Sequence, residues 1–211
     1  MYSALSPPHH SPGYEADYLV ASQLPGPEAL PQLRKTLSSA LKQYPDFPQP
    51  GILFEDIFPL FASPNVHRAL LHAFILTIDQ NSSTKPDVII GLDARGFLIG
   101  PSLALHYNCS FAPVRKPGKL PGQLHTVEYQ KEYGKDSFAI QQEAVKPGQR
   151  VAVVDDLIAT GGSAAAAQDL VKKCGGELLG FCFLIELTFL KGREKLGDGS
   201  KVWTVLESQA D

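Results

Sequence analysis

The stretch Val151-Ala-Val-Val-Asp-Asp-Leu-Ile-Ala-Thr-Gly-Gly-Ser163 decides the fold class of this chain. Its apolar start, 151–154, predicts a buried strand. The glycines and Ser163 then predict a tight turn that opens a helix over 163–173, which ends at Gly175-Gly176. A buried strand followed directly by a helix is half of a βαβ unit. The stretch therefore predicts an α/β fold with a parallel sheet.

The same alternation of strands and helices continues on both sides. Helical spacing of apolar residues predicts helices over about 31–44, 64–78 and 96–107. Apolar runs predict strands over 87–92, 110–115, 137–141, 177–187 and 201–206. We expect an open, mostly parallel sheet flanked by helices on both faces.

Two segments without periodicity are predicted to be loops. Prolines at positions 45, 48 and 50 exclude a helix and the interior of a sheet, which predicts an irregular loop there. Residues 116–134 contain two Pro-Gly pairs and no regular spacing of apolar residues. A loop this long in a compact domain is usually functional or disordered.

Composition narrows the class of protein. Residues 1–30 are rich in Pro and Ser, so we expect a disordered extension followed by a single domain over 31–211. The extension lacks the features of a secretory signal, and no stretch is long enough to span a membrane. Three cysteines without a metal or disulfide pattern favour a cytoplasmic protein. A net charge of −3 gives no general attraction to nucleic acid or to anionic membranes.

The turn after the strand at 151–154 predicts a phosphate site. Gly161 and Gly162 let the backbone approach an anion closely, and the following helix start adds unpaired N–H groups. Thr160 and Ser163 add hydroxyl groups. We expect the segment Ala159, Thr160, Gly161, Gly162 and Ser163 to bind one phosphate group.

Two acids, Asp155 and Asp156, lie just before this turn. Alone they would indicate only turn residues, and beside a phosphate they would repel it. Their position is explained if they accept hydrogen bonds from ribose hydroxyls or hold a hydrated Mg²⁺. The ligand is therefore expected to be a phosphorylated sugar.

This segment resembles the motif with which the type I phosphoribosyltransferases bind 5-phosphoribosyl-1-pyrophosphate (PRPP). Other segments are similar to the adenine phosphoribosyltransferases within that family, in order and with matching spacing from about Leu33 to Leu206. They are Tyr44-Pro-Asp-Phe-Pro-Gln-Pro-Gly-Ile-Leu-Phe54, Gly91-Leu-Asp-Ala-Arg-Gly-Phe-Leu-Ile-Gly100, Val114-Arg-Lys-Pro-Gly-Lys-Leu-Pro-Gly122, Glu132-Tyr-Gly-Lys135 and Leu187-Thr-Phe-Leu-Lys-Gly-Arg-Glu-Lys-Leu196.

The resemblance implies transfer of the phosphoribosyl group of PRPP to N9 of adenine, giving AMP and pyrophosphate. It also implies a homodimer, a flexible hood loop at about 116–136, an N-terminal loop that binds the base, and Mg²⁺ held mainly by substrate oxygens and water without a direct protein ligand. Two alternatives stay open: the same transfer to another base, or a regulator on this fold that binds PRPP or AMP without catalysis.

The resemblance also assigns roles to individual residues. Glu132 matches the general acid/base of the hood, and Tyr129 and Tyr133 would orient the hood. The 5′-phosphate and ribose roles agree with those inferred above. Pyrophosphate binding is implied for Asp93, Ala94, Arg95, Arg115, Lys116 and Lys119. Adenine binding is implied for Leu53, Phe54 and Leu157, and for Glu55 through its backbone, although many family members have Arg at that position.

Overall fold

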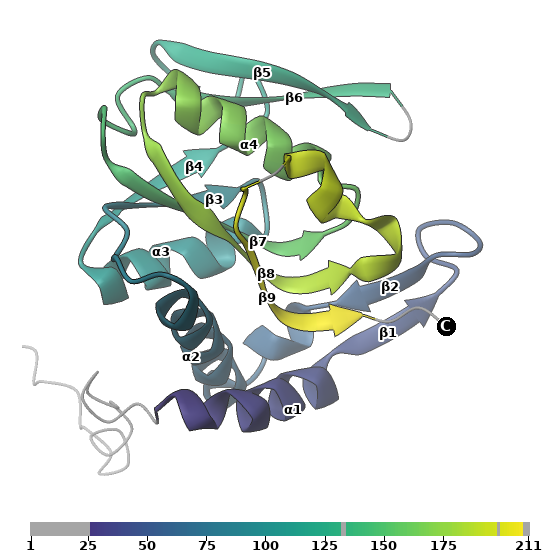
Figure 1. Ribbon diagram of the computed structural model, residues 1–211. Helices are drawn as coiled ribbons and strands as arrows, with labels where there is room; N and C mark the ends of the chain where they lie inside the picture. Colours follow the sequence, from purple (N-terminus) through teal and green to yellow (C-terminus); the bar gives the residue numbers. More distant parts are fainter. Residues whose placement is uncertain (1–25, 132–133, 198, 209–211) are drawn as a thin grey trace, which may run out of the picture.

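The computed structural model describes residues 26–131, 134–197 and 199–208. Its centre is a five-stranded sheet in the order β4-β3-β7-β8-β9, with every neighbouring pair parallel (Figure 1). The strands are β3 (Val88–Leu92), β4 (Ser110–Val114), β7 (Arg150–Ile158), β8 (Glu177–Leu187) and β9 (Val202–Ser208). The predicted α/β fold with a parallel sheet is confirmed. In the described part of the chain, no helix is long and apolar enough to cross a membrane.

Helices cover both faces of the sheet. One face packs against α1 (Leu30–Ala40), α2 (Pro64–Asn81) and α3 (Gly96–Tyr107), and the other against α4 (Gly162–Lys173). Alternate strand residues serve the two cores: Ala152 lies in the core under α2 and α3, and Val153 lies in the core under α4. Each strand is buried on both sides, which explains the continuous apolar runs in the sequence.

The order of the strands reverses between β3 and β7. The chain leaves β3 through α3 to reach β4 on one side, and it leaves β7 through α4 to reach β8 on the other. The carboxyl ends of β3 and β7 are therefore neighbours from which the two crossover helices diverge. In open α/β sheets, this reversal point is where ligands bind.

Two predictions around the prolines are wrong in part: α1 ends at Ala40, so the predicted helix over 31–44 is too long, and strands flank the predicted irregular loop. β1 (Lys42–Pro45) and β2 (Leu53–Asp56) form an antiparallel hairpin that is separate from the central sheet. Pro45 ends its strand, and Pro48 and Pro50 lie in the connection, where the backbone donates no ladder hydrogen bond. The prolines thus limit the length of the two strands but do not prevent the hairpin from forming.

The predicted loop over 116–134 is also wrong in part. β5 (Leu124–Lys131) and β6 (Gly134–Gln141) form a second antiparallel hairpin, which we call the hood hairpin. Val127 and Tyr129 pack against the α4 core while Thr126 and Glu128 are exposed, so the strand has the usual period of two. This alternation was present in the sequence, but it is short and depends on α4 for burial.

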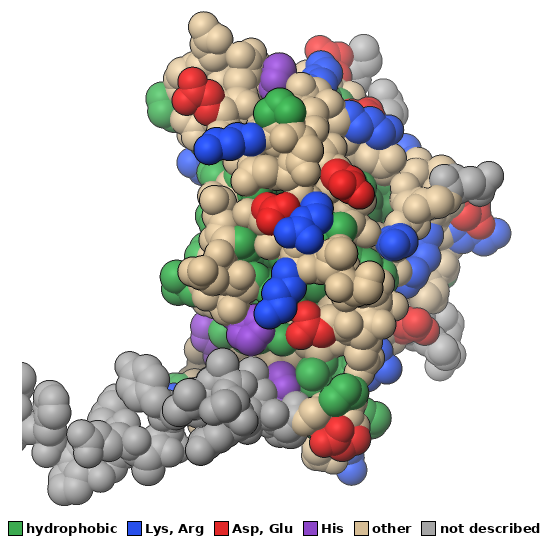
Figure 2. Space-filling view, turned by 60° about the vertical axis from the view of Figure 1, so that its left-hand side comes forward, with side chains coloured by type: hydrophobic (Ala, Val, Ile, Leu, Met, Phe, Trp, Pro, Cys, Tyr) green, Lys and Arg blue, Asp and Glu red, His purple; other side chains and the backbone are tan. Residues whose placement is uncertain are grey.

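The outer side of α3 remains apolar. Leu98 and Leu105 are 40% and 84% exposed, and Pro101 lies between them on the same side of the helix. Figure 2 turns this side of the molecule forward and shows hydrophobic side chains among the charged ones. A helix that is apolar on both sides usually has a partner on each.

Candidate active site

The ends of β3 and β7 are in direct contact. After β3 the chain passes through Asp93 and Ala94, which are joined by a cis peptide bond, and α3 begins at Gly96. A Cβ atom on Gly96 would lie 2.7 Å from the carbonyl oxygen of Val154, so a side chain there would force the loop away from β7. The Gly96 N–H donates a hydrogen bond to the Asp155 carboxylate. The predicted pyrophosphate loop therefore rests against the predicted ribose acids.

Arg95 joins three of the predicted parts of the site. Its Nη1 donates to Oδ2 of the buried Asp156 at 2.6 Å. Its guanidinium carbon lies 5.3 Å from the centre of the Phe54 ring, in cation–π contact. One side chain thus connects the predicted pyrophosphate loop, the acid pair and the β1–β2 hairpin, which we call the base hairpin after its predicted role.

The other predicted cations lie around the first turn of α3 and the base of the hood hairpin. Nε of Arg115 donates to Oδ2 of Asp93 at 3.0 Å, and Nη1 donates to the carbonyl oxygen of Lys119 at 3.4 Å. Lys116 is paired with Asp136 at 3.5 Å, at the start of β6. Arg115 is therefore held beside the pyrophosphate loop, and Lys116 links that region to the hood hairpin.

β7 extends to Ile158, four residues beyond the predicted end of the strand, because β8 pairs with it as far as Ile158. Asp155 and Asp156 consequently lie within the strand and point to opposite faces. Burial, followed by the negative charge of Asp156, raises the pKa of Asp155 well above its ordinary value. Hydrogen bonds from the backbone N–H groups of Gly96 and Asp156 partly offset this rise in pKa.

The predicted phosphate turn is shaped by close backbone contacts. Gly161 has φ +76°, which favours glycine, and α4 begins at the next residue. A Cβ on Gly161 would lie 2.1 Å from the carbonyl oxygen of Gly192, and a Cβ on Gly192 would lie 2.2 Å from that of Ala159. The turn is thus supported from behind by the 3₁₀ helix η5 (Gly192–Leu196). α4 begins at Gly162, so its first backbone N–H groups lie at the turn where the phosphate site is predicted.

Sequence reasoning missed how η5 is held. The Nε of Arg193 donates to both carboxylate oxygens of Glu186, at 2.7 and 2.8 Å, and Nη1 donates to the carbonyl oxygen of Val202 at 2.5 Å. Glu186 is buried at the end of β8. Truncating Arg193 would leave that carboxylate buried and unpaired, which is costly. In the sequence, the segment 187–196 indicates only a similarity to the family and does not predict this ion pair.

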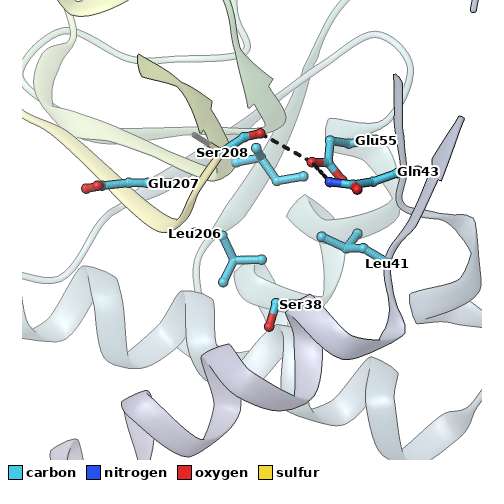
Figure 3. Close-up of a pocket in the computed structure, with 8 residues that line it drawn as sticks. Ser38, Leu41, Gln43, Glu55, Leu206, Glu207 and Ser208 are labelled. Carbon is cyan, nitrogen blue, oxygen red and sulfur yellow. Dashed lines mark hydrogen bonds between the residues drawn. The ribbon is translucent and has the colours of Figure 1, made fainter. Parts of the chain in front are cut away.

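The base hairpin presents its two faces to different parts of the protein. Side chains alternate along β2, so Phe54 faces Arg95, whereas the Glu55 carboxylate accepts hydrogen bonds from Gln43 and Ser208 on the other face (Figure 3). Leu53 is 44% exposed beside them. Leu157 follows Asp155 on the same face of β7. In the hood, the Tyr129 ring packs 5.1 Å from that of Phe138, while Glu132 and Tyr133 lie outside the described residues.

Comparison with known proteins identifies the family. The family model of the phosphoribosyl transferase domain matches residues 60–210. The adenine phosphoribosyltransferase of Yarrowia lipolytica is 56% identical over 182 residues, which are 86% of this chain and 99% of that protein. The chain belongs to the adenine phosphoribosyltransferase family. Adenine phosphoribosyltransferase 1 of Saccharomyces cerevisiae is 50% identical over 176 residues, covering 83% of this chain and 93% of that protein.

Solved structures of this family have the same fold. The S. cerevisiae adenine phosphoribosyltransferase in complex with adenine and D-2,5-dideoxy-2,5-imino-altritol 1,6-bisphosphate matches with a TM-score of 0.80 and 49% identity, covering 83% of this chain and 99% of that one. The Trypanosoma brucei family member in complex with AMP, pyrophosphate and ribose-5-phosphate matches with a TM-score of 0.74 and 29% identity, covering 83% and 79%. The family predicted from the sequence is confirmed.

Two glycines provide a matched test of the phosphate turn in this phosphoribosyltransferase. Gly161 and Gly197 both have φ +76°, but a Cβ on Gly197 would meet nothing within 4 Å. Alanine should strain the backbone by about 1–2 kcal/mol at Gly161, whose ψ is 0°, and by at least as much at Gly197, whose ψ of 166° lies in a region that almost only glycine adopts, so backbone strain alone does not make Gly161→Ala the worse variant. Only Gly161→Ala should also push the turn away from η5, and we expect it to weaken PRPP binding at least about tenfold in calorimetry. Equal PRPP affinity in the two variants would contradict this role of the turn.

The raised pKa of Asp155 predicts a pH-dependent stability. A carboxyl group with a raised folded-state pKa contributes stability below its unfolded pKa of about 4, and this contribution is lost as the pH rises toward the folded-state value. Asparagine does not titrate, so Asp155→Asn does not lose this stability. Without substrate, we therefore expect the melting temperature of Asp155→Asn minus that of wild type to increase between about pH 4.5 and about pH 8. Asp169→Asn, which changes an exposed acid of α4, is the control. A difference in melting temperature that is constant with pH would refute the assignment.

Proposed function

We propose that the chain transfers the 5-phosphoribosyl group of PRPP to N9 of adenine, giving AMP and pyrophosphate, at the site where β3 and β7 end. The observation that carries this proposal is that Arg95 connects the predicted pyrophosphate loop, the acid pair and a ring that can stack on a base, while the predicted phosphate turn begins three residues after Asp156. These are the parts that PRPP and a purine need. Membership of the adenine phosphoribosyltransferase family supports adenine as the acceptor.

In the proposed complex, PRPP lies along the reversal point of the sheet. The 5′-phosphate is bound by the backbone N–H groups of 159–163 with the hydroxyls of Thr160 and Ser163. Asp155 and Asp156 accept hydrogen bonds from the ribose hydroxyls. The pyrophosphate is bound by the loop of Asp93, Ala94 and Arg95, together with Arg115, Lys116 and Lys119. Arg95 then exchanges its contact with Asp156 for the pyrophosphate oxygens.

The reaction forms a bond between N9 of adenine and C1′ while the bond from C1′ to the pyrophosphate oxygen breaks. Positive charge develops on the ribose, and water competes with adenine for C1′, so exclusion of water matters. The hood hairpin, oriented by Tyr129 and Tyr133, provides that exclusion. Glu132 takes up the proton that adenine loses, a role that rests on its family match.

Phe54 and Leu157 form apolar faces for the purine, and Leu53 belongs to the same hairpin. β1 pairs with only one edge of β2. Among the described strands, none pairs with the other edge, which leaves backbone N–H and C=O groups around Leu53–Glu55 to read the base. A backbone reader can match the amino donor and N1 acceptor of adenine.

Mg²⁺ supplies charge neutralisation on the pyrophosphate leaving group when it is bound. Without substrate, Asp156 pairs with Arg95 and Asp93 pairs with Arg115. The described residues contain no cluster of three acids, histidines or cysteines arranged around a metal. This donor set fits an ion held mainly by substrate oxygens and water, with Asp155 and Asp156 as acids that could bind its water molecules.

The choice of base is tested by supplying PRPP, Mg²⁺ and each purine separately. Hypoxanthine and guanine present an acceptor at C6 and a donor at N1, the reverse of adenine. Two unmatched buried groups at ~1–3 kcal/mol each predict that kcat/KM for adenine is higher by roughly 10²–10⁴. Comparable values for hypoxanthine would overturn the assignment of adenine. Binding of PRPP or AMP without nucleotide formation would show a regulator instead.

The functional unit is proposed to be a homodimer in the cytoplasm. The exposed apolar side of α3, with Leu98, Pro101 and Leu105, is a suitable surface for a second copy, because isolated copies would leave it in water. α3 follows directly from the pyrophosphate loop, so the dimer would also brace that loop. The cysteines are unpaired thiols, which agrees with a reducing compartment.

Leu105→Glu tests the dimer surface. A carboxylate in the centre of an apolar interface would be desolvated without a partner, so we expect the variant to sediment as a monomer at concentrations where wild type is a dimer. Ser39→Glu adds the same charge to an exposed position of α1 and should leave the dimer intact. A Leu105→Glu protein that remains dimeric would place the interface elsewhere.

A further inference from the structure

The base hairpin is attached to the rest of the protein without shared backbone pairing. β1 and β2 form their own sheet, and their residues are exposed or half-buried along both strands. A groove of about 350 Å³ separates the hairpin from α1 and the end of β9, with Leu41 and Leu206 on its walls (Figure 3). The hairpin is therefore not fixed by close packing on this side, and its position depends on contacts across the groove.

The Glu55 side chain makes such a contact. Its Oε1 accepts a hydrogen bond from Nε2 of Gln43 at 2.9 Å and from Oγ of Ser208 at 3.3 Å. Gln43 lies directly opposite Glu55 in the hairpin, and Ser208 ends β9. One carboxylate oxygen thus connects both hairpin strands to the central sheet.

The anchor on the sheet is itself fixed. The carbonyl oxygen of Ser208 accepts a hydrogen bond from Oγ1 of Thr188 at 3.4 Å, and Ser208 pairs with Leu187 of β8. The bridge therefore ends on the last residues of two central strands. The hydrogen bond from Ser208 to Glu55 therefore holds the hairpin against the same sheet that carries Asp155 and Asp156.

We propose that the Gln43–Glu55–Ser208 bridge positions the hairpin for adenine binding. Because side chains alternate along β2, the strand that Glu55 fastens on one face presents Phe54 to Arg95 on the other. Glu55 and Ser208 act through the hairpin and need no contact with the base. The inference rests on adenine being the acceptor of the reaction proposed above.

The chemistry at position 55 is specific. A carboxylate or an amide offers an oxygen that accepts from both Gln43 and Ser208, and a charged acceptor makes the stronger bonds. Alanine offers no acceptor. Arginine, the residue common at this position in the family, has only donors and would have to fix the hairpin differently.

Steady-state kinetics of full-length variants tests the bridge. For Glu55→Ala and Ser208→Ala we expect KM for adenine to rise about three- to tenfold, the range that follows from losing one or two hydrogen bonds. KM for PRPP and kcat should change by less than about twofold, because neither hydrogen bond of the bridge involves the phosphate turn. Glu55→Gln keeps an acceptor oxygen and should recover most of the adenine affinity.

Two comparisons separate positioning from general loss of structure. Ser38→Ala removes a hydroxyl at the same groove that bonds only within α1, to the carbonyl oxygen of Lys35, and should leave KM for adenine unchanged. The double variant Glu55→Ala/Ser208→Ala should be no worse than Glu55→Ala alone, because both changes remove one bridge.

The proposal is overturned if Ser208→Ala leaves KM for adenine unchanged, if its effect adds fully to that of Glu55→Ala, or if KM for PRPP rises in parallel. Wild-type protein serves as the separate test of the reaction. If it forms no AMP from adenine and PRPP, the proposed function fails, independently of the variants.

Discussion

The contact between the ends of β3 and β7 is the constraint around which the site is arranged. Gly96 brings the first turn of α3 to within reach of Asp155, and Arg95 reaches across to Asp156 at 2.6 Å. The absence of a Cβ atom at Gly96 allows this approach, because any side chain there would collide with the carbonyl oxygen of Val154. With these two strand ends fixed, the proposed pyrophosphate loop and the proposed ribose acids lie in direct contact.

The phosphate turn depends on a second layer of contacts. Gly161 and Gly192 place two backbone segments closer together than side chains would permit, and the Arg193–Glu186 ion pair holds η5 in that place. The Glu186 carboxylate is buried whereas the Arg193 side chain is 42% exposed, so the pair favours this geometry because the carboxylate would be costly to bury without its partner. The turn is thus fixed by residues that lie outside the predicted phosphate-binding segment.

Two antiparallel hairpins border this rigid centre, and both are attached by side chains more than by backbone pairing. The hood hairpin packs Val127 and Tyr129 on the α4 core and meets the sheet at a bridge between Ala139 and Arg115. The base hairpin is connected through Phe54 on one face and Glu55 on the other. These side-chain contacts can break at a small cost in free energy, which suits the proposed roles of the two hairpins in admitting and enclosing substrates.

The sequence by itself determined the parallel sheet, the helices and the glycine turn before α4, because strands buried on both faces and glycine turns at helix starts leave strong local patterns. It also indicated the chemistry of Asp155, Asp156 and Arg95 through the types of residue at the strand ends. The tertiary structure alone decided where β7 ends, since β8 extends the pairing past the acids. Only the tertiary structure decided that the two hairpins form, because their short alternating patterns of apolar and polar residues gain stability only when α4 or β9 lies beside them. Ser208 is 153 residues from Glu55 in the chain and Glu186 is 7 residues from Arg193, and no local pattern specifies that folding will bring these side chains within hydrogen-bond distance.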